Sequence, residues 1–263
     1  MTPTINALKP ATAMAAAFAA VFTATAKVSY TAHYTDDIPF DGTPDNGAWR
    51  DIGWSTTLVR RSDGKTPDKT TTRFKACYTA DAVYVAVECA EPNIAGLADE
   101  HQAHEFWLCD VVELFSTAIK NEQIHLICSA RGNLNQEIPG TTDVRTRSHV
   151  DWSAKAKIGA DRWTCCFRIP FLLFGKTPTD GPVTVRFNVC RNATTTKELS
   201  CWSQAKSFKN EADFGMLTLS AAPAKASEAI RRAADPSLIP ETPAEREKRE
   251  KTAAIMKALF EEE

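Results

Sequence analysis

Apolar and polar residues alternate in short runs from about residue 27 to residue 220. Runs of this kind, rich in β-branched and aromatic residues and bounded by turn-forming residues, are typical of β-strands. No long amphipathic helix interrupts them, which argues against alternating β-α units. The sequence therefore predicts an all-β domain, either a sandwich or a barrel. Its predicted strands are residues 73–78, 82–89, 110–116, 123–130, 153–158, 162–169, 183–191, 199–204 and 214–219.

The first 26 residues follow a different pattern. Lys9 precedes an uncharged, alanine-rich stretch, residues 11–26, that ends in Ala24-Thr25-Ala26. Such a stretch with small residues at its end is typical of a secretory signal peptide, here cleaved after Ala26. The alternative is an uncleaved amphipathic helix. Cleavage would leave a mature chain that is secreted, periplasmic or attached to the cell surface.

The pattern changes again after residue 220. Residues 221–263 contain no glycine and no cysteine and mix acidic with basic side chains. Thr242 and Glu245 form a capping box that predicts a helix from there to about Phe260. We expect a charged, solvated, partly ordered helical tail; the alternative is a helix that docks on the sandwich or on a partner protein. The predicted organisation is a signal peptide (1–26), a β-sandwich domain (27–220) and a charged helical tail (221–263).

Composition and charge narrow the classes of function. The chain has 31 Lys and Arg and 33 Asp and Glu, a formal net charge of −2. This balance argues against a nucleic-acid-binding surface. No glycine-rich phosphate-binding loop occurs. After residue 26, no apolar run approaches the roughly 20 residues of a transmembrane helix.

Eight cysteines lie after the predicted cleavage site, and none of their spacings is that of a zinc site. Export makes disulfides feasible, and the alternative is that most cysteines are small buried apolar residues. Cys165 and Cys166 should point to opposite faces of one strand. Cys190 and Cys201 flank a predicted hairpin turn and could lie opposite each other.

Catalytic groupings are missing from the sequence. Asp110 and Glu113 are the best acidic pair, but residues three apart on a strand point to opposite faces. They therefore cannot act as the two carboxyl groups that a glycosidase needs at one site. His101 and His104 lack a metalloprotease motif, and no Gly-x-Ser-x-Gly elbow occurs. We expect a binding protein and not an enzyme.

Trp107 stands out among the aromatic residues because it precedes a predicted strand within a polar segment. An exposed tryptophan offers a large flat face at a low entropy cost, and such a face suits the apolar C–H side of a sugar ring. The alternative is that Trp107 folds back into the core. Trp49 and Trp163 are expected to be packing residues.

A series of short motifs runs through residues 38–219. They are Phe40-Asp41-Gly42 with Trp49, the hairpin at 78–87, Asp110-Val111-Val112-Glu113-Leu114-Phe115, Trp163 with Ile169-Pro170-Phe171, Asn188 with Arg191, Trp202-Ser203, and Phe214-Gly215-Met216-Leu217. Each motif is weak alone. Together, and in this order, they resemble the family 9 carbohydrate-binding modules that are found attached to xylanases and other glycoside hydrolases.

The resemblance implies an antiparallel β-sandwich that binds plant-type polysaccharide ends or small sugars during polysaccharide breakdown. In that family two aromatic rings clamp a terminal sugar, and polar side chains bind its hydroxyl groups. The clamp positions fall on Trp107 and Phe208, and the polar positions fall on Glu113 and His125. Phe208 stands where the family has a tryptophan, and His125 stands where it has an arginine.

Other functions remain open from the sequence alone. Some family members hold structural calcium through oxygen ligands, but no calcium site can be assigned here, and no cofactor is certain. A related sandwich could bind haem for redox chemistry, which would need an axial His/Met pair; Met216 is the one methionine within residues 27–220. A third alternative is a surface interaction protein with a degenerate sugar pocket.

Overall fold

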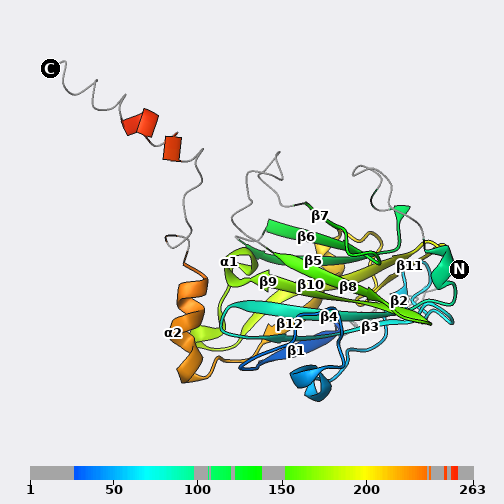
Figure 1. Ribbon diagram of the computed structural model, residues 1–263, viewed down its shortest axis with the longest axis horizontal. Coiled ribbons are helices and arrows are strands. Elements are labelled where there is room, and N and C mark those ends of the chain that lie inside the picture. The colour runs from blue at the N-terminus through cyan, green and yellow to red at the C-terminus, as the bar shows by residue number, and fades with distance from the viewer. Residues whose placement is uncertain are drawn as a thin grey trace, which may run out of the picture.

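Two β-sheets pack face to face in the computed structural model, and the helical segments lie around them (Figure 1). The structure describes residues 27–97, 106, 108–119, 122–137, 152–235, 237, 246–247 and 250–253. The predicted signal peptide, residues 1–26, lies outside the described residues. No described helix has the length and apolar character needed to cross a membrane.

Sheet A is built around one long strand, β10 (Val183–Ala193). One edge of β10 pairs with β5 (Val111–Ile119), which continues to β6 (Glu122–Ser129) and β7 (Leu134–Glu137). The other edge pairs first with β12 (Gly215–Leu219) and then with β11 (Glu198–Cys201). The two-residue strand β2 (Val59–Arg60) pairs antiparallel with β11.

Sheet B contains four antiparallel strands. Their order is β3 (Thr72–Tyr78), β4 (Ala82–Ala90), β9 (Arg162–Pro170) and β8 (Ser153–Ile158). The β3–β4 hairpin turns at residues 79–81, as the sequence predicts. A single helical turn, α1 (Phe171–Phe174), follows β9 and ends at Gly175, whose φ of 76° is the left-handed conformation that glycine tolerates.

Strand β1 (Ser29–Tyr34) joins the two sheets. Its first residues, from Ser29 to Ala32, pair with β12 in sheet A, and His33 and Tyr34 pair with β3 in sheet B. Both pairings are parallel, so the expected antiparallel arrangement holds for every described strand pair except the two that involve β1.

The main core lies between the two sheets. Sheet A contributes alternate residues such as Val112, Leu114 and Phe187, and sheet B contributes residues such as Phe74 and Val85. All of these side chains are at most 2% exposed. Each fully buried side chain of this size stabilises the fold by about 1.5–3 kcal/mol through removal of apolar surface from water.

A second core covers the outer face of sheet B. Trp49 lies in a short 3-10 helix, η1 (Gly47–Asp51), and is fully buried against Tyr84, Ala86 and Cys166. Its indole N–H donates to the carbonyl of Pro39. Trp49 and Trp163 are therefore packing residues, as expected, and both faces of β4 are buried.

The structure contains each of the strands that the sequence predicts, with ends shifted by a few residues. It also contains β1, β2 and β7, which the sequence analysis did not predict. The predicted strand at residues 199–204 ends earlier, at Cys201, because the chain leaves the sheet there and folds back over its outer face as residues 202–214.

A helix that the sequence analysis did not predict, α2 (Ala224–Ala233), packs against the sandwich beside α1 (Figure 1). Ala226 and Ile230, one turn apart, are buried in the main core. Lys225 pairs with Asp36. The packed unit thus extends beyond the predicted boundary at residue 220. Of the helix predicted from Thr242 to Phe260, only residues 246–247 and 250–253 are described, and these are helical.

All eight cysteines lie in the described part of the chain, and each is a buried thiol. Cys165 faces the main core and Cys166 faces the second core, as the alternation on a strand predicts. Cys190 and Cys201 lie directly opposite each other on β10 and β11.

Candidate functional site

The outer face of sheet A carries the predicted polar residues. Val112 and Leu114 of β5 point into the main core. Because successive side chains of a strand alternate between its faces, Glu113 and Phe115 point to the outer face. On the neighbouring strand β6, His125 is the direct partner of Phe115. Three side chains from two adjacent strands therefore share one face.

Glu113 and His125 are bonded to each other. The distance from His125 Nε2 to Glu113 Oε2 is 2.7 Å, and the two residues are only 7% and 5% exposed. The imidazole stacks on the ring of Phe115, with centroids 4.2 Å apart and an angle of 16° between the planes. Burial strengthens this polar contact. The stack and the hydrogen bond together fix the orientation of the imidazole.

Residues 202–214, which we call the Phe208 loop, follow β11. Trp202 packs in the main core, and the rest of the loop folds over this face. The ring of Phe208 lies 6.5 Å from that of Phe115, and Phe214 lies 5.8 Å from Phe115 on the same side. Gln123 of β6 donates a hydrogen bond from its side-chain amide to the carbonyl of Lys209 in the loop. The fold thus brings Phe208 onto the face that carries Glu113 and His125, although it lies more than 80 residues away in the sequence.

Trp107, the other predicted aromatic of the site, lies outside the described residues. Phe106 and Leu108, its neighbours along the chain, are described. Phe106 and Cys109 pack with Val111 and Ile127, which belong to the outer face of β5 and β6. Phe106 and Cys109 therefore lie on the face that carries Glu113 and His125.

Phe115 is a site residue that the sequence analysis did not assign. It forms the base on which the His125 ring stacks and the ring against which Phe208 rests. Its position two residues after Glu113 places it on the same face of a strand, and this periodicity could have identified it. Arg61, whose guanidinium lies 5.8 Å from the Phe208 ring centroid, had no such sequence pattern.

Asp110 and Glu113 do not form an acid–base pair, as the sequence predicts. Glu113 is bonded to His125, whereas Asp110 accepts a hydrogen bond from Thr194 and faces Arg191. Burial raises the pKa of Asp110 above its usual value. Arg191 is fully buried and pairs with Glu91 at 2.9 Å. These charges form a structural network inside the sandwich, separate from the outer face.

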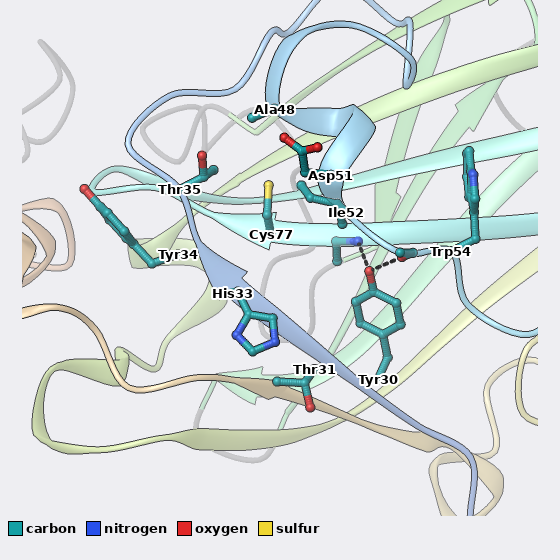
Figure 2. A pocket seen from close by; sticks show the side chains of 12 residues that line it. Tyr30, Thr31, His33, Tyr34, Thr35, Ala48, Asp51, Ile52, Trp54 and Cys77 are labelled. Atoms are coloured by element: carbon teal, nitrogen blue, oxygen red, sulfur yellow. Dashed lines mark hydrogen bonds between the residues drawn. The ribbon is translucent and has the colours of Figure 1, made fainter.

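A groove of about 510 Å³ opens elsewhere, between β1, η1 and β3 (Figure 2). His33 and Thr31 of β1 line one side, and Asp51 and Ile52 line the other. The described site residues Glu113, His125 and Phe208 do not line it. Tyr30 also lines the groove, and its hydroxyl donates to Gly53 O and accepts from Ala76 N.

Metal ligands do not gather in the described residues. Within the described ranges, no three His, Cys, Asp or Glu side chains are grouped so that they could hold a metal ion. The structure therefore assigns no residues to the calcium ion that the family resemblance left open.

Solved structures that match this fold include carbohydrate-binding proteins. A family 9 carbohydrate-binding module from Caldicellulosiruptor kristjanssonii, in complex with cellotriose, aligns with a TM-score of 0.57 and 16% identity, over 82% of this chain and 100% of that chain. A family 9 module from the same organism in complex with glucose gives a TM-score of 0.56 and 17% identity, over 74% of this chain and 97% of that one. A candidate carbohydrate-binding protein from Bacteroides uniformis aligns with a TM-score of 0.54 and 14% identity, over 74% of this chain and 100% of that chain.

No protein-family profile and no curated protein matches the chain. At 14–17% identity, the structural likeness concerns the arrangement of the strands. It extends over the whole of the first family 9 module and most of this chain. The chain therefore has the β-sandwich fold of the family 9 carbohydrate-binding modules.

Proposed function

We propose that this protein is an exported, non-catalytic carbohydrate-binding protein whose site is the outer face of sheet A. The observation that carries the proposal is the grouping of Glu113, His125 and Phe208. The family resemblance assigns a sugar-binding role to each of these positions, and the three side chains gather on one face. The family 9 fold supports the same class of ligand.

The chemistry of the grouping suits a neutral sugar. Glu113 has a second carboxylate oxygen, Oε1, that its bond to His125 does not use. This oxygen can accept a hydrogen bond from a sugar hydroxyl, and charge-assisted bonds of this kind are the stronger ones. Phe208 offers an aromatic ring for the apolar face of the sugar, and Trp107 would supply the second ring. We propose glucose-based oligosaccharides as the ligand, since the structural neighbours were solved with cellotriose and glucose.

The cellular setting is part of the proposal. The alanine-rich stretch before Ala26 supports export with removal of residues 1–26, and the binding site supports a role in polysaccharide breakdown. N-terminal sequencing of exported protein should begin at Lys27. Exported material that still begins at Met1 would contradict export by this route.

Calorimetric titration of the mature protein with cellotriose tests the binding site. Glu113→Gln should weaken binding by about 1.5–3 kcal/mol, because it replaces a charged acceptor with a neutral one. Phe208→Ala should weaken it by about 1 kcal/mol, and Trp107→Ala by about 1–3 kcal/mol, magnitudes taken from base–aromatic stacking. The control is His33→Ala, a histidine in the separate groove.

Each outcome has a definite meaning. Loss of affinity in Glu113→Gln and Phe208→Ala, with His33→Ala unchanged, supports the outer face of sheet A. Loss confined to His33→Ala would place the sugar in the groove of Figure 2 and would overturn the assigned site. The absence of any binding to cellotriose and to an array of other glycans would overturn the proposed function.

A further inference from the structure

Two cysteines meet under the Phe208 loop. Cys190 of β10 and Cys201 of β11 are direct partners in the antiparallel register. The backbone hydrogen bond next to them joins Trp202 N to Val189 O at 2.8 Å, which are the residues just after Cys201 and just before Cys190. This bond marks Cys190 and Cys201 as a non-hydrogen-bonded pair, in which the Cα atoms lie about 4.5 Å apart. Disulfides span Cα separations of about 4.4–6.8 Å.

The two side chains also lie on the same face and in the same cluster. Both are fully buried and pack with Phe115, Phe214 and Ala205. Each thiol also affects the pKa of the other, as expected for neighbouring groups in one buried cluster. The strand register thus already places the two residues as a disulfide requires, and a bond between them needs no rearrangement of the strands.

The two thiols differ in acidity. The hydrogen bond from Cys190 lowers the pKa of Cys201 below the usual value for a thiol, and the backbone N–H of Ala205 acts in the same direction. Burial raises the pKa of Cys190 well above that value. Burial also raises the pKa values of the thiols elsewhere in the core, at Cys77, Cys89, Cys165 and Cys166. Within the packed structure, Cys201 is therefore the more acidic thiol of the two.

We propose that Cys190 and Cys201 form a cross-strand disulfide that fastens the start of the Phe208 loop to β10. Cys201 is the last residue of β11, and the loop begins at the next residue. Strand β11 has four residues, and among the described strands its partners are β10 and the two-residue strand β2. A covalent link at Cys201 would therefore secure the weakest anchor of the loop.

The bond forms by exchange with a low-molecular-weight disulfide such as oxidised glutathione. The Cys201 thiolate attacks one sulfur of the oxidant, which forms a mixed disulfide and releases one glutathione thiolate. Cys190 then loses its proton and attacks the Cys201 sulfur, which releases the second glutathione. Two protein thiols are oxidised and one external disulfide is reduced. Both sulfur atoms are buried, so the exchange takes place before the loop packs or while it is open.

Peptide mapping tests the link directly. Cleavage after Lys and Arg places Cys190 in the peptide 187–191 and Cys201 in the peptide 198–206. After incubation of the folded protein with oxidised glutathione and alkylation of the remaining thiols, these two peptides should appear joined, two hydrogens lighter than their sum. Cys190→Ala and Cys201→Ala should each abolish the joined peptide, and Cys109→Ala should not. Alkylation of both cysteines after oxidation, or a link to any other cysteine, would overturn the proposal.

Limited proteolysis tests whether the link secures the loop. Lys206 and Lys209 are exposed trypsin sites within it. Oxidised protein should be cut there several-fold more slowly than protein kept in dithiothreitol, and it should melt roughly 5–10 °C higher. The Cys201→Ala variant should be cut at the same rate after oxidation and in dithiothreitol. Equal rates in oxidised and reduced wild-type protein would overturn the fastening role. Neither experiment uses a sugar, so its outcome is independent of the proposed binding function.

Discussion

Tyr30 bridges the part of β1 that does not pair with β3. Its hydroxyl accepts from Ala76 N at 3.1 Å and donates to Gly53 O at 2.7 Å, so it takes the place of a missing strand neighbour (Figure 2). Burial raises the pKa of Tyr30 to about 12. A raised pKa means that this residue's contribution to stability is complete below pH 10, the ordinary value for tyrosine, and is lost as the pH rises from about 10 to about 12.

We expect Tyr30→Phe to lower the free energy of unfolding by about 1–3 kcal/mol at pH 8, because Ala76 N–H loses its acceptor. Between pH 10 and 12 the variant should lose less stability than the wild type, since it has no phenol to ionise at this position. Urea unfolding at a series of pH values measures both effects. Tyr34→Phe is the control at pH 8, because its hydroxyl bonds to the exposed Asp36. An identical pH dependence in Tyr30→Phe and wild type would contradict this account.

Strand periodicity predicts which face of a sheet a residue lies on, and Phe115 could have been placed on the face of Glu113 in this way. The sugar-binding roles of Glu113 and His125 rest on the family resemblance and stay predictions. Arg191 belongs to one of the motifs that resemble family 9, but its structural role depends on its ion pair with Glu91, which lies 100 residues away. Such a contact depends on how the strands pair in space, and no local pattern in the sequence encodes it.

Among the elements that the sequence analysis missed, β1 and α2 are the longest. Strand β1 has a mixed polar sequence and pairs in parallel with strands far along the chain, so its stability comes from those partners. Helix α2 has only Ala226 and Ile230 as buried residues. Two apolar positions one turn apart are too few to stand out from a charged tail.

Helix α2 should contribute to the stability of the sandwich. Ile230 is fully buried in the main core, so Ile230→Ala should lower the free energy of unfolding by about 2–4 kcal/mol. Glu228→Ala, at an exposed position of the same helix, should change it by less than about 0.5 kcal/mol. A chain that ends at residue 220 should melt at a lower temperature than the full chain. Denaturant and thermal unfolding measure these effects, and unchanged stability of the shortened chain would show that α2 is an independent tail.

At the scale of the whole molecule, the number of predicted strands indicated a sandwich or barrel, and the motif order indicated the sandwich. The pairing of the strands could not be predicted from the sequence, because it joins segments that are distant along the chain. Strand β10 pairs with three strands at once, and β1 belongs to both sheets. The candidate site depends on this pairing, since β5, β6 and the Phe208 loop meet only through it.

The shared strand β1 should make the two sheets one cooperative unit. Ala32 of β1 is fully buried in the main core, so Ala32→Asp would place an unpaired charge there and should cost on the order of 4 kcal/mol. Native-state hydrogen exchange should show that the slowest amides of β5 and β10 in sheet A, and those of β4 and β9 in sheet B, lose protection by the same amount. Thr31→Asp, at the adjacent exposed position, is the control and should change little. Loss of protection in only one of the two sheets would show that each sheet unfolds on its own and that β1 does not couple them.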